Sequence, residues 1–97
     1  MSVEFFTDSV IASISGEIDM LTVGRFTAVL VDLLDSGRPT LVVDLLDVGF
    51  LDCAGLTALL DVAKRAARRN VLLRVVPSAA VSDLSRLVGV AHLLDLE

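Results

Sequence analysis

The sequence has little of what most enzymes and exported proteins depend on. Its 97 residues include one cysteine, one histidine, two prolines and neither tryptophan nor tyrosine. A single thiol, Cys53, excludes an internal disulfide. No pair of Cys or His residues has metal-ligand spacing, and no phosphate-binding loop of the GxGxxG or GxxxxGK[ST] type occurs. The only histidine, His92, fits a structural role. We therefore expect no metal site, no cofactor and no enzymatic activity.

Long apolar segments and a basic leader are also missing. The longest apolar stretch, residues 48–63, is broken by Asp52 and Asp61, whereas a membrane helix needs about 18 uninterrupted apolar residues. The N-terminal residues contain Glu4 and no basic residue, unlike a secretory signal. We expect no membrane insertion, and together with the lone cysteine this predicts a cytoplasmic protein.

Basic residues are scarce in the first two thirds of the chain. Thirteen acidic and eight basic residues give a net charge of −5. Residues 1–61 carry ten acids and two bases, whereas residues 62–97 carry three acids and six bases. An acidic surface repels phosphate backbones, so we expect no nucleic-acid partner. Four clustered bases are typical of the solvated last turns of a helix: Lys64, Arg65, Arg68 and Arg69.

Apolar residues, 55% of the chain, are sufficient for the core of one domain spanning residues 1–97. Short apolar runs predict strands at 3–6, 10–14, 41–45 and 71–76, with a turn at 7–9 and a loop at 48–52. Helical periodicity predicts helices starting near Thr22, Cys53 and Ser78. This order predicts an α/β fold with a mixed, mostly parallel sheet and helices packed against it, and the apolar residues at 10–14 predict that both faces of that strand are covered. A last apolar run, residues 93–96, is expected either to form an edge strand or to cover the core.

The three helices are expected to bury apolar stripes. The predicted inward positions are Phe26, Val29, Leu30, Leu33 and Leu34 in the first helix, Leu56, Leu59, Leu60, Ala63 and Ala67 in the second, and Val81, Leu84, Leu87 and Val88 in the third.

Aspartates gather near the predicted strand ends: Asp19, Asp44, Asp47 and Asp52. Carboxylates at the carboxyl edge of a parallel sheet can hold Mg²⁺ or serve as a catalytic pair. They can equally stabilise turns and helix starts. Because no lysine, threonine or phosphate loop accompanies them, the second interpretation is favoured, and a small Mg²⁺-dependent enzyme is the less favoured alternative.

Three short motifs occur in order: G-E-I-D at 16–19, F-L-D-C-A-G-L at 50–56 and L-V-G-V at 87–90. With the strand and helix around the second motif, they resemble the STAS-domain family of bacterial anti-sigma factor antagonists. The resemblance covers nearly the whole chain and implies a STAS-like single domain. It also implies a non-enzymatic module that works in transcription regulation by partner switching. Such an antagonist binds an anti-sigma factor that is also a serine kinase of the histidine-kinase-like ATPase type, and so frees the sigma factor.

The resemblance also implies a site. In the family the kinase phosphorylates the serine that follows the turn aspartate, and here that position is Cys53, followed by Ala54. The usual switch is therefore predicted to be absent or to have moved. By resemblance the partner-binding residues are Asp19, Asp47, Asp52, Cys53, Ala54, Gly55 and Thr57, with Gly55 allowing close backbone approach. The oligomeric state is expected to be a monomer or weak dimer.

Two questions stay open. Cys53 has three interpretations. It is an inert residue that fills the space of serine, or a variant of a natural serine, or a redox-active thiol. A helix N-terminus would favour the thiolate form of a redox-active Cys53, whereas the charge of Asp52 would disfavour it. The chain is alternatively a STAS subunit or scaffold of a larger assembly, such as an accessory of a lipid-transport ATPase or a stress-signalling complex.

Overall fold

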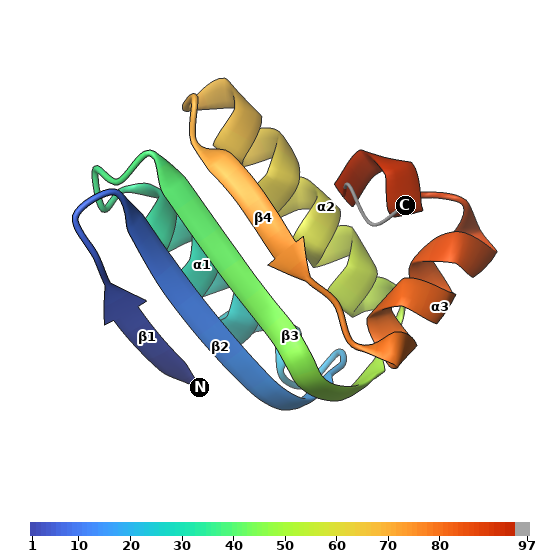
Figure 1. Cartoon of the computed structure of the whole chain (residues 1–97). Coiled ribbons are helices and arrows are strands. Elements are labelled where there is room, and N and C mark those ends of the chain that lie inside the picture. The colour runs from blue at the N-terminus through green and yellow to red at the C-terminus, as the bar shows by residue number, and fades with distance from the viewer. Residues whose placement is uncertain (95–97) are drawn as a thin grey trace.

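A computed structural model describes residues 1–94 and contains one four-stranded sheet, in which the strands follow the order of the chain (Figure 1). The strands are β1 (Ser2–Phe5), β2 (Ser9–Ile18), β3 (Thr40–Leu51) and β4 (Leu72–Val76). Strand β1 pairs with β2 in antiparallel fashion, and β2, β3 and β4 are parallel to one another. The predicted mixed, mostly parallel sheet is confirmed.

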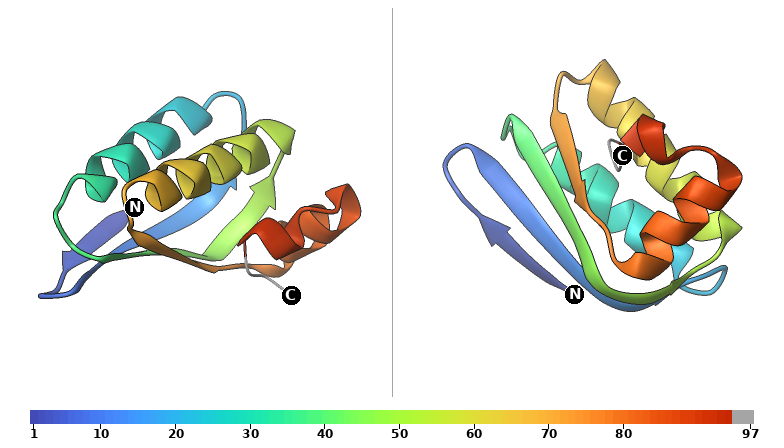
Figure 2. Two further views of the ribbon diagram at one scale, coloured as in Figure 1. Left: turned by 90° about the horizontal axis from the view of Figure 1, so that it is seen from above. Right: turned by 45° about the vertical axis from the view of Figure 1, so that its right-hand side comes forward.

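The helices are α1 (Val23–Leu34), α2 (Cys53–Arg68), α3 (Ala79–Val88) and a 3₁₀ turn, η1 (Ala91–Leu94). Helices α1 and α2 lie side by side on one face of the sheet (Figure 2). Both crossovers step across the sheet in the same direction, so crossovers of one hand place both helices on the same face. Helix α3 packs beside β3, and η1 returns toward α2.

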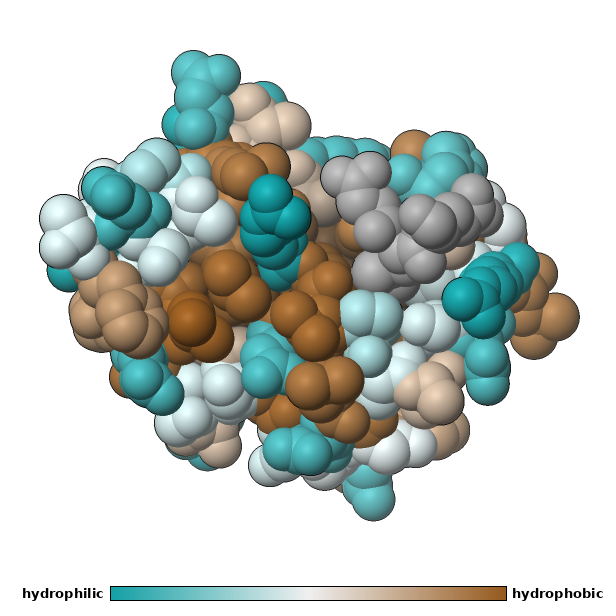
Figure 3. Space-filling view, in the orientation of Figure 1, coloured by the Kyte–Doolittle hydropathy of each residue, from teal (hydrophilic) through white to brown (hydrophobic). Residues whose placement is uncertain are grey.

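The other face of the sheet carries no helix among residues 1–94, so the expectation that both faces are covered is wrong (Figure 1). Half-buried apolar residues such as Ile11 and Val42 lie there, and brown surface gathers over the middle of this face with teal groups within and around it (Figure 3). Ser13, Asp44 and Arg74 sit at positions of the same face, where water solvates them. The face is therefore solvent-facing but not uniformly polar.

One hydrophobic core lies between the sheet and α1 and α2. Alternate residues of β2 and β3 point into it, and Leu30, Leu59 and Val62 meet them from the helices, all fully buried. The predicted stripe of α2 is partly wrong, because Val62 and Ala66 are buried whereas Ala67 is exposed. The buried positions 55, 59, 62 and 66 have the same spacing as the predicted 56, 60, 63 and 67 but lie one residue earlier, so the face of α2 that meets the core is turned around the helix axis from the predicted one.

The last turn of α3 projects past the core. Leu87 is 84% exposed and Val88 is 52% exposed, so their predicted burial is wrong, whereas Val81 is fully buried as expected. Ser85 is fully buried instead, and its hydroxyl has no hydrogen-bond partner within residues 1–94. The helix ends as predicted at Gly89, whose φ of 85° is left-handed.

Strands β2 and β3 are longer than predicted, and the loop expected at 48–52 is strand up to Leu51. Two register shifts between these strands explain the difference, because extra residues in β3 break the apolar alternation that marks a strand. Gly16, at φ 88°, occupies one of the shifts, and the Asp44 carboxylate accepts a bond from the Leu46 N–H at the other (3.0 Å). Of the run 93–96, Leu93 and Leu94 belong to η1, and the rest lies outside the described residues.

Candidate functional site

Asp52 joins the end of β3 to the start of α2. Its backbone is extended, and its Oδ1 accepts a hydrogen bond from the Gly55 N–H (2.9 Å), as an N-cap residue does. Its carbonyl accepts the Leu56 N–H (3.0 Å), and its own N–H donates to the carbonyl of Ile18 at the end of β2 (3.1 Å). The predicted helix start is confirmed, and the turn is fixed to both neighbouring elements.

Gly55 seats the first turn of α2 directly on β2. A Cβ at this position would lie 2.5 Å from Leu51 Cδ1, 2.8 Å from the Ile18 carbonyl oxygen and 2.9 Å from Ile18 Cγ2. The backbone of α2 therefore approaches β2 closely at Gly55, whereas a role of Gly55 in partner binding stays a prediction. Gly55 is buried, so it sets the position of the first turn of α2 without being exposed itself.

The remaining predicted residues of α2 lie on its first turns. Cys53 is the first helical residue and is exposed, and Ala54 is partly exposed. Thr57 is exposed one turn later, where its hydroxyl donates to the Cys53 carbonyl (2.8 Å). The helix therefore presents a thiol at its amino end and a hydroxyl tied to its own backbone.

The loop between β2 and α1, residues 19–22, lies next to this turn because Ile18 bonds to Asp52; we call it the Asp19 loop. Asp19 Oδ1 accepts hydrogen bonds from the N–H of Leu21 (2.9 Å) and the N–H of Thr22 (3.1 Å). Thr22 Oγ1 accepts the Asp19 N–H (3.0 Å), and its single proton can be donated either to the Glu17 carbonyl (3.0 Å) or to Asp19 Oδ1 (3.3 Å). Thr22 precedes α1 as predicted, but its side chain makes no cap bond within that helix.

The Asp19 loop exposes apolar residues that the sequence reasoning did not single out. Met20 is 79% exposed and Leu21 is 93% exposed, and Phe50, which pairs with Glu17 in the β2–β3 register, is 51% exposed. The available signal was an apolar pair between two loop residues, Asp19 and Thr22, outside any helical stripe.

Acidic side chains surround this end of the molecule. Asp19 and Asp52 are partly exposed and Glu17 is exposed, and the ion pairs found among residues 1–94 involve other carboxylates: Asp35, Asp61 and Asp83. The structure thus brings together Asp19, Asp52, Cys53, Ala54, Gly55 and Thr57. Asp47 lies apart, beside Ser15 and roughly 15 Å back along β3 from Asp52.

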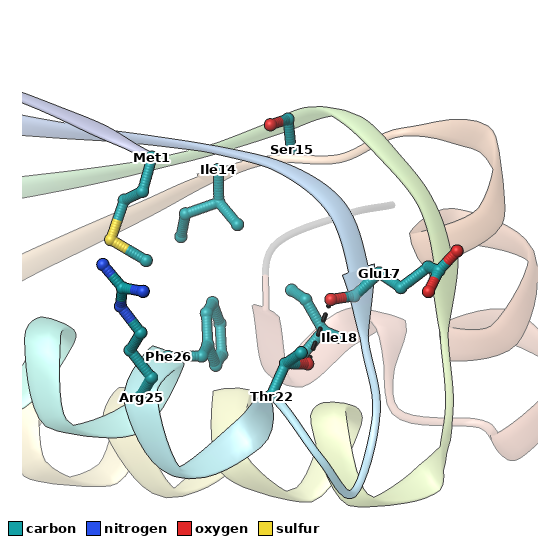
Figure 4. A pocket seen from close by; sticks show the side chains of 8 residues that line it. All are labelled: Met1, Ile14, Ser15, Glu17, Ile18, Thr22, Arg25 and Phe26. Carbon is teal, nitrogen blue, oxygen red and sulfur yellow. Dashed lines mark hydrogen bonds between the residues drawn. The ribbon is translucent and has the colours of Figure 1, made fainter.

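A pocket of about 180 Å³ opens on the other side of β2, between that strand and α1 (Figure 4). Ile14, Ile18 and Phe26 form its apolar wall, and Met1 and Arg25 lie together at one side (Figure 4). None of its lining residues comes from β3 or α2, but Ile18 and Thr22 connect the pocket to the Asp52 turn and the Asp19 loop.

Two further observations bear on the candidate chemistry. Within residues 1–94, no three His, Cys, Asp or Glu side chains cluster closely enough to share a metal ion. No helix in the same part of the chain has both the length and the apolar character needed to cross a membrane.

Comparisons with known proteins cover nearly the whole chain. A family model described as "Mlab, STAS domain" matches residues 1–95. An anti-sigma factor antagonist from Mycobacterium paratuberculosis is 28% identical, with a TM-score of 0.84 over 94% of this chain and 78% of that one. No curated protein matches this sequence as a relative.

Two more distant structures share the fold. The Bacillus cell fate determinant SpoIIAA, solved in its phosphorylated form, is 18% identical, with a TM-score of 0.72 over 95% of this chain and 86% of that one. A sulfate transporter family protein from Wolinella succinogenes is 19% identical, with a TM-score of 0.77 over 91% of this chain and 72% of that one. The arrangement of sheet and helices therefore recurs in proteins of different kinds.

Proposed function

This chain belongs to the STAS-domain family, and from that premise we propose that it is an anti-sigma factor antagonist that works by partner switching. It binds an anti-sigma factor that is a serine kinase of the histidine-kinase-like ATPase type, and this binding releases the sigma factor. The protein acts by association and not by catalysis, in the bacterial cytoplasm, as a monomer or weak dimer. The antagonist from Mycobacterium paratuberculosis supports this role by its likeness over 94% of the chain.

One observation carries the proposal. An exposed residue, Cys53, opens α2 directly after the N-cap Asp52, at the position where the family motif has its phosphoacceptor serine. The same turn is bonded to Ile18, the residue that directly precedes the Asp19 loop. Any change of charge at position 53 would therefore alter a surface built from two adjoining segments.

The physics of such a switch depends on charge. A phosphate adds about −1.5 to −2 charges, and a helix N-terminus tolerates an anion well, so the fold survives the modification. The added charge instead repels a partner that has docked on an already acidic surface. Cys53 has no hydroxyl to accept a phosphoryl group, and Thr57 commits its hydroxyl to the helix backbone (2.8 Å). We propose that binding in this protein is not switched off by phosphorylation at position 53.

Mass spectrometry tests this proposal. The protein and its Cys53→Ser and Cys53→Ala variants are incubated with purified anti-sigma kinases of the source organism and ATP, and intact masses are measured. We expect a phosphate on Cys53→Ser alone, with Cys53→Ala as the matched control for loss of the thiol. Phosphate on the native protein would contradict it. In a pull-down from cell extract, recovery of a transport ATPase in place of an anti-sigma factor would also contradict it.

The role of the thiol needs a separate measurement. Cys53 is exposed, so its labelling rate at neutral pH reports its reactivity directly. We propose that Cys53 fills the place of serine as an unreactive residue, and we expect a rate equal to that of a model thiol. A much faster rate would favour the redox interpretation.

A further inference from the structure

We propose that Met20 and Leu21 are the hydrophobic anchors of the partner interface and insert into an apolar pocket that the partner borders with basic side chains. This inference rests on the proposed function and names the chemistry of the partner's binding surface. It shifts the role of Asp19 from contacting the partner to holding these two residues in place.

The exposure of the pair is the first observation. Leu21, at 93%, and Met20, at 79%, rank with Leu87, at 84%, as the most exposed large apolar side chains in the described part of the chain. Single exposed apolar residues are common on protein surfaces, whereas two consecutive ones in one short loop offer a partner a larger apolar contact. A concave apolar partner surface would bury side chains this exposed more completely than a flat one.

The rigidity of the loop is the second observation. The Asp19 carboxylate accepts hydrogen bonds from the N–H groups of Leu21 and Thr22, and the Thr22 hydroxyl oxygen accepts the Asp19 N–H (3.0 Å). Side chains held on an ordered turn lose little backbone entropy on binding, so more of their burial appears as affinity. Leu87 lies in the last turn of α3, far from any such brace.

The position of the Asp19 loop and the charge around it indicate what kind of partner surface binds there. The Ile18–Asp52 bond places the Asp19 loop beside the amino end of α2, so one partner can touch Met20, Leu21 and Cys53 together. Glu17 and Asp52 make no ion pair among residues 1–94, and the nearby Arg25 lies beside Met1 at the pocket (Figure 4). A basic rim around an apolar pocket complements this surface.

Binding measurements test the inference. Affinities for the purified anti-sigma kinases of the source organism are compared for the native protein, the double variant Met20→Ser/Leu21→Ser, and the matched control Leu87→Ser. We expect the double variant to bind roughly ten- to hundredfold more weakly, as for hot-spot residues, and the control to bind normally. Melting temperatures should be unchanged for both, because the replaced side chains touch water in the free protein.

A second variant examines the brace. Thr22→Val keeps the shape of the side chain and removes the hydroxyl that links Asp19 to Glu17. Because Met20 and Leu21 are still present, we expect the loss of affinity to be smaller than in the double variant. Higher ionic strength should weaken binding of the native protein, because its acidic surface meets a basic rim.

The outcomes separate the two proposals. If the native protein binds a kinase and the double variant binds equally well, the anchors are refuted while the proposed function stands. If the native protein binds no kinase of the panel, the proposed function fails and the inference fails with it. Equal losses in the double variant and in Leu87→Ser would also refute a specific role for the Asp19 loop.

Discussion

Replacing Gly55 with alanine tests whether α2 is seated on β2 as closely as the structure indicates. The added methyl would approach three atoms within 3.0 Å, and one of them is the Ile18 carbonyl oxygen, 2.8 Å away. A backbone atom cannot rotate aside as a side chain can. The start of α2 must therefore lift, which strains the bond between the Asp52 N–H and that same carbonyl (3.1 Å).

The magnitude follows from two opposing effects. Overpacking costs about 1–3 kcal/mol, whereas alanine in place of glycine stabilises a compatible helical site by about 0.4–1 kcal/mol. The expected net loss is roughly 1–2 kcal/mol, or about 4–16 °C in melting temperature for a domain of this size. Urea and thermal unfolding followed by circular dichroism measure both quantities.

Gly24 in α1 supplies the control. A Cβ there meets no atom within 4 Å, so Gly24→Ala should raise the unfolding free energy by about 0.4–1 kcal/mol. If Gly55→Ala proves as stable as Gly24→Ala, the close contact between α2 and Ile18 does not exist in solution, and the proposed coupling of the Asp19 loop to Cys53 loses its basis.

Substitutions at three further residues have definite expectations. Asp52→Asn keeps a side-chain oxygen to cap Gly55 and removes a charge, so unfolding in urea should change little while affinity for the partner falls; Asp52→Ala should lose about 1 kcal/mol of stability as well. Ser85→Ala removes a buried hydroxyl without a partner among residues 1–94, so calorimetry should show equal or higher stability, and a loss above about 1 kcal/mol would reveal a hidden hydrogen bond. Arg38→Ala loses a contact with the Phe5 ring (4.7 Å to its centre) and a hydrogen bond to the β1–β2 turn, so β1 amides should exchange faster in a hydrogen-exchange experiment, with a stability loss of roughly 1 kcal/mol.

Element order was predictable because the local signals agree with the tertiary structure. The turn after β1, the N-caps Asp52 and Ser78 and the left-handed Gly89 lie where sequence chemistry places them. The extent of β2 and β3 was not predictable, because extra residues in β3 interrupt the alternation on which strand prediction depends. The burial of α3 was misjudged for a different reason: a short helix looks amphipathic in sequence whether or not the core extends to its last turn.

The candidate site likewise has features that the sequence predicts and features that depend on the folded structure. The placement of Asp52, Cys53 and Gly55 together was predictable from a contiguous motif, since residues this close in sequence share one helical turn. The place of Asp19 beside Asp52 was expected from the order of the motifs, and the pairing of β2 with β3 supplies the bond that brings Ile18 to Asp52 across 34 positions of sequence. The exposure of Met20 and Leu21 depends on that same long-range geometry, and composition alone gives no measure of it.

The order of the strands has a consequence for how the molecule is made. Each strand lies next to the one that precedes it in the chain, so a nascent polypeptide leaving the ribosome always finds its pairing edge already synthesised. No strand has to wait for a later one to arrive and insert between its neighbours. The growing sheet can add one strand at a time, from β1 to β4. The amino end of α2 can contact β2 before the final third of the chain has emerged.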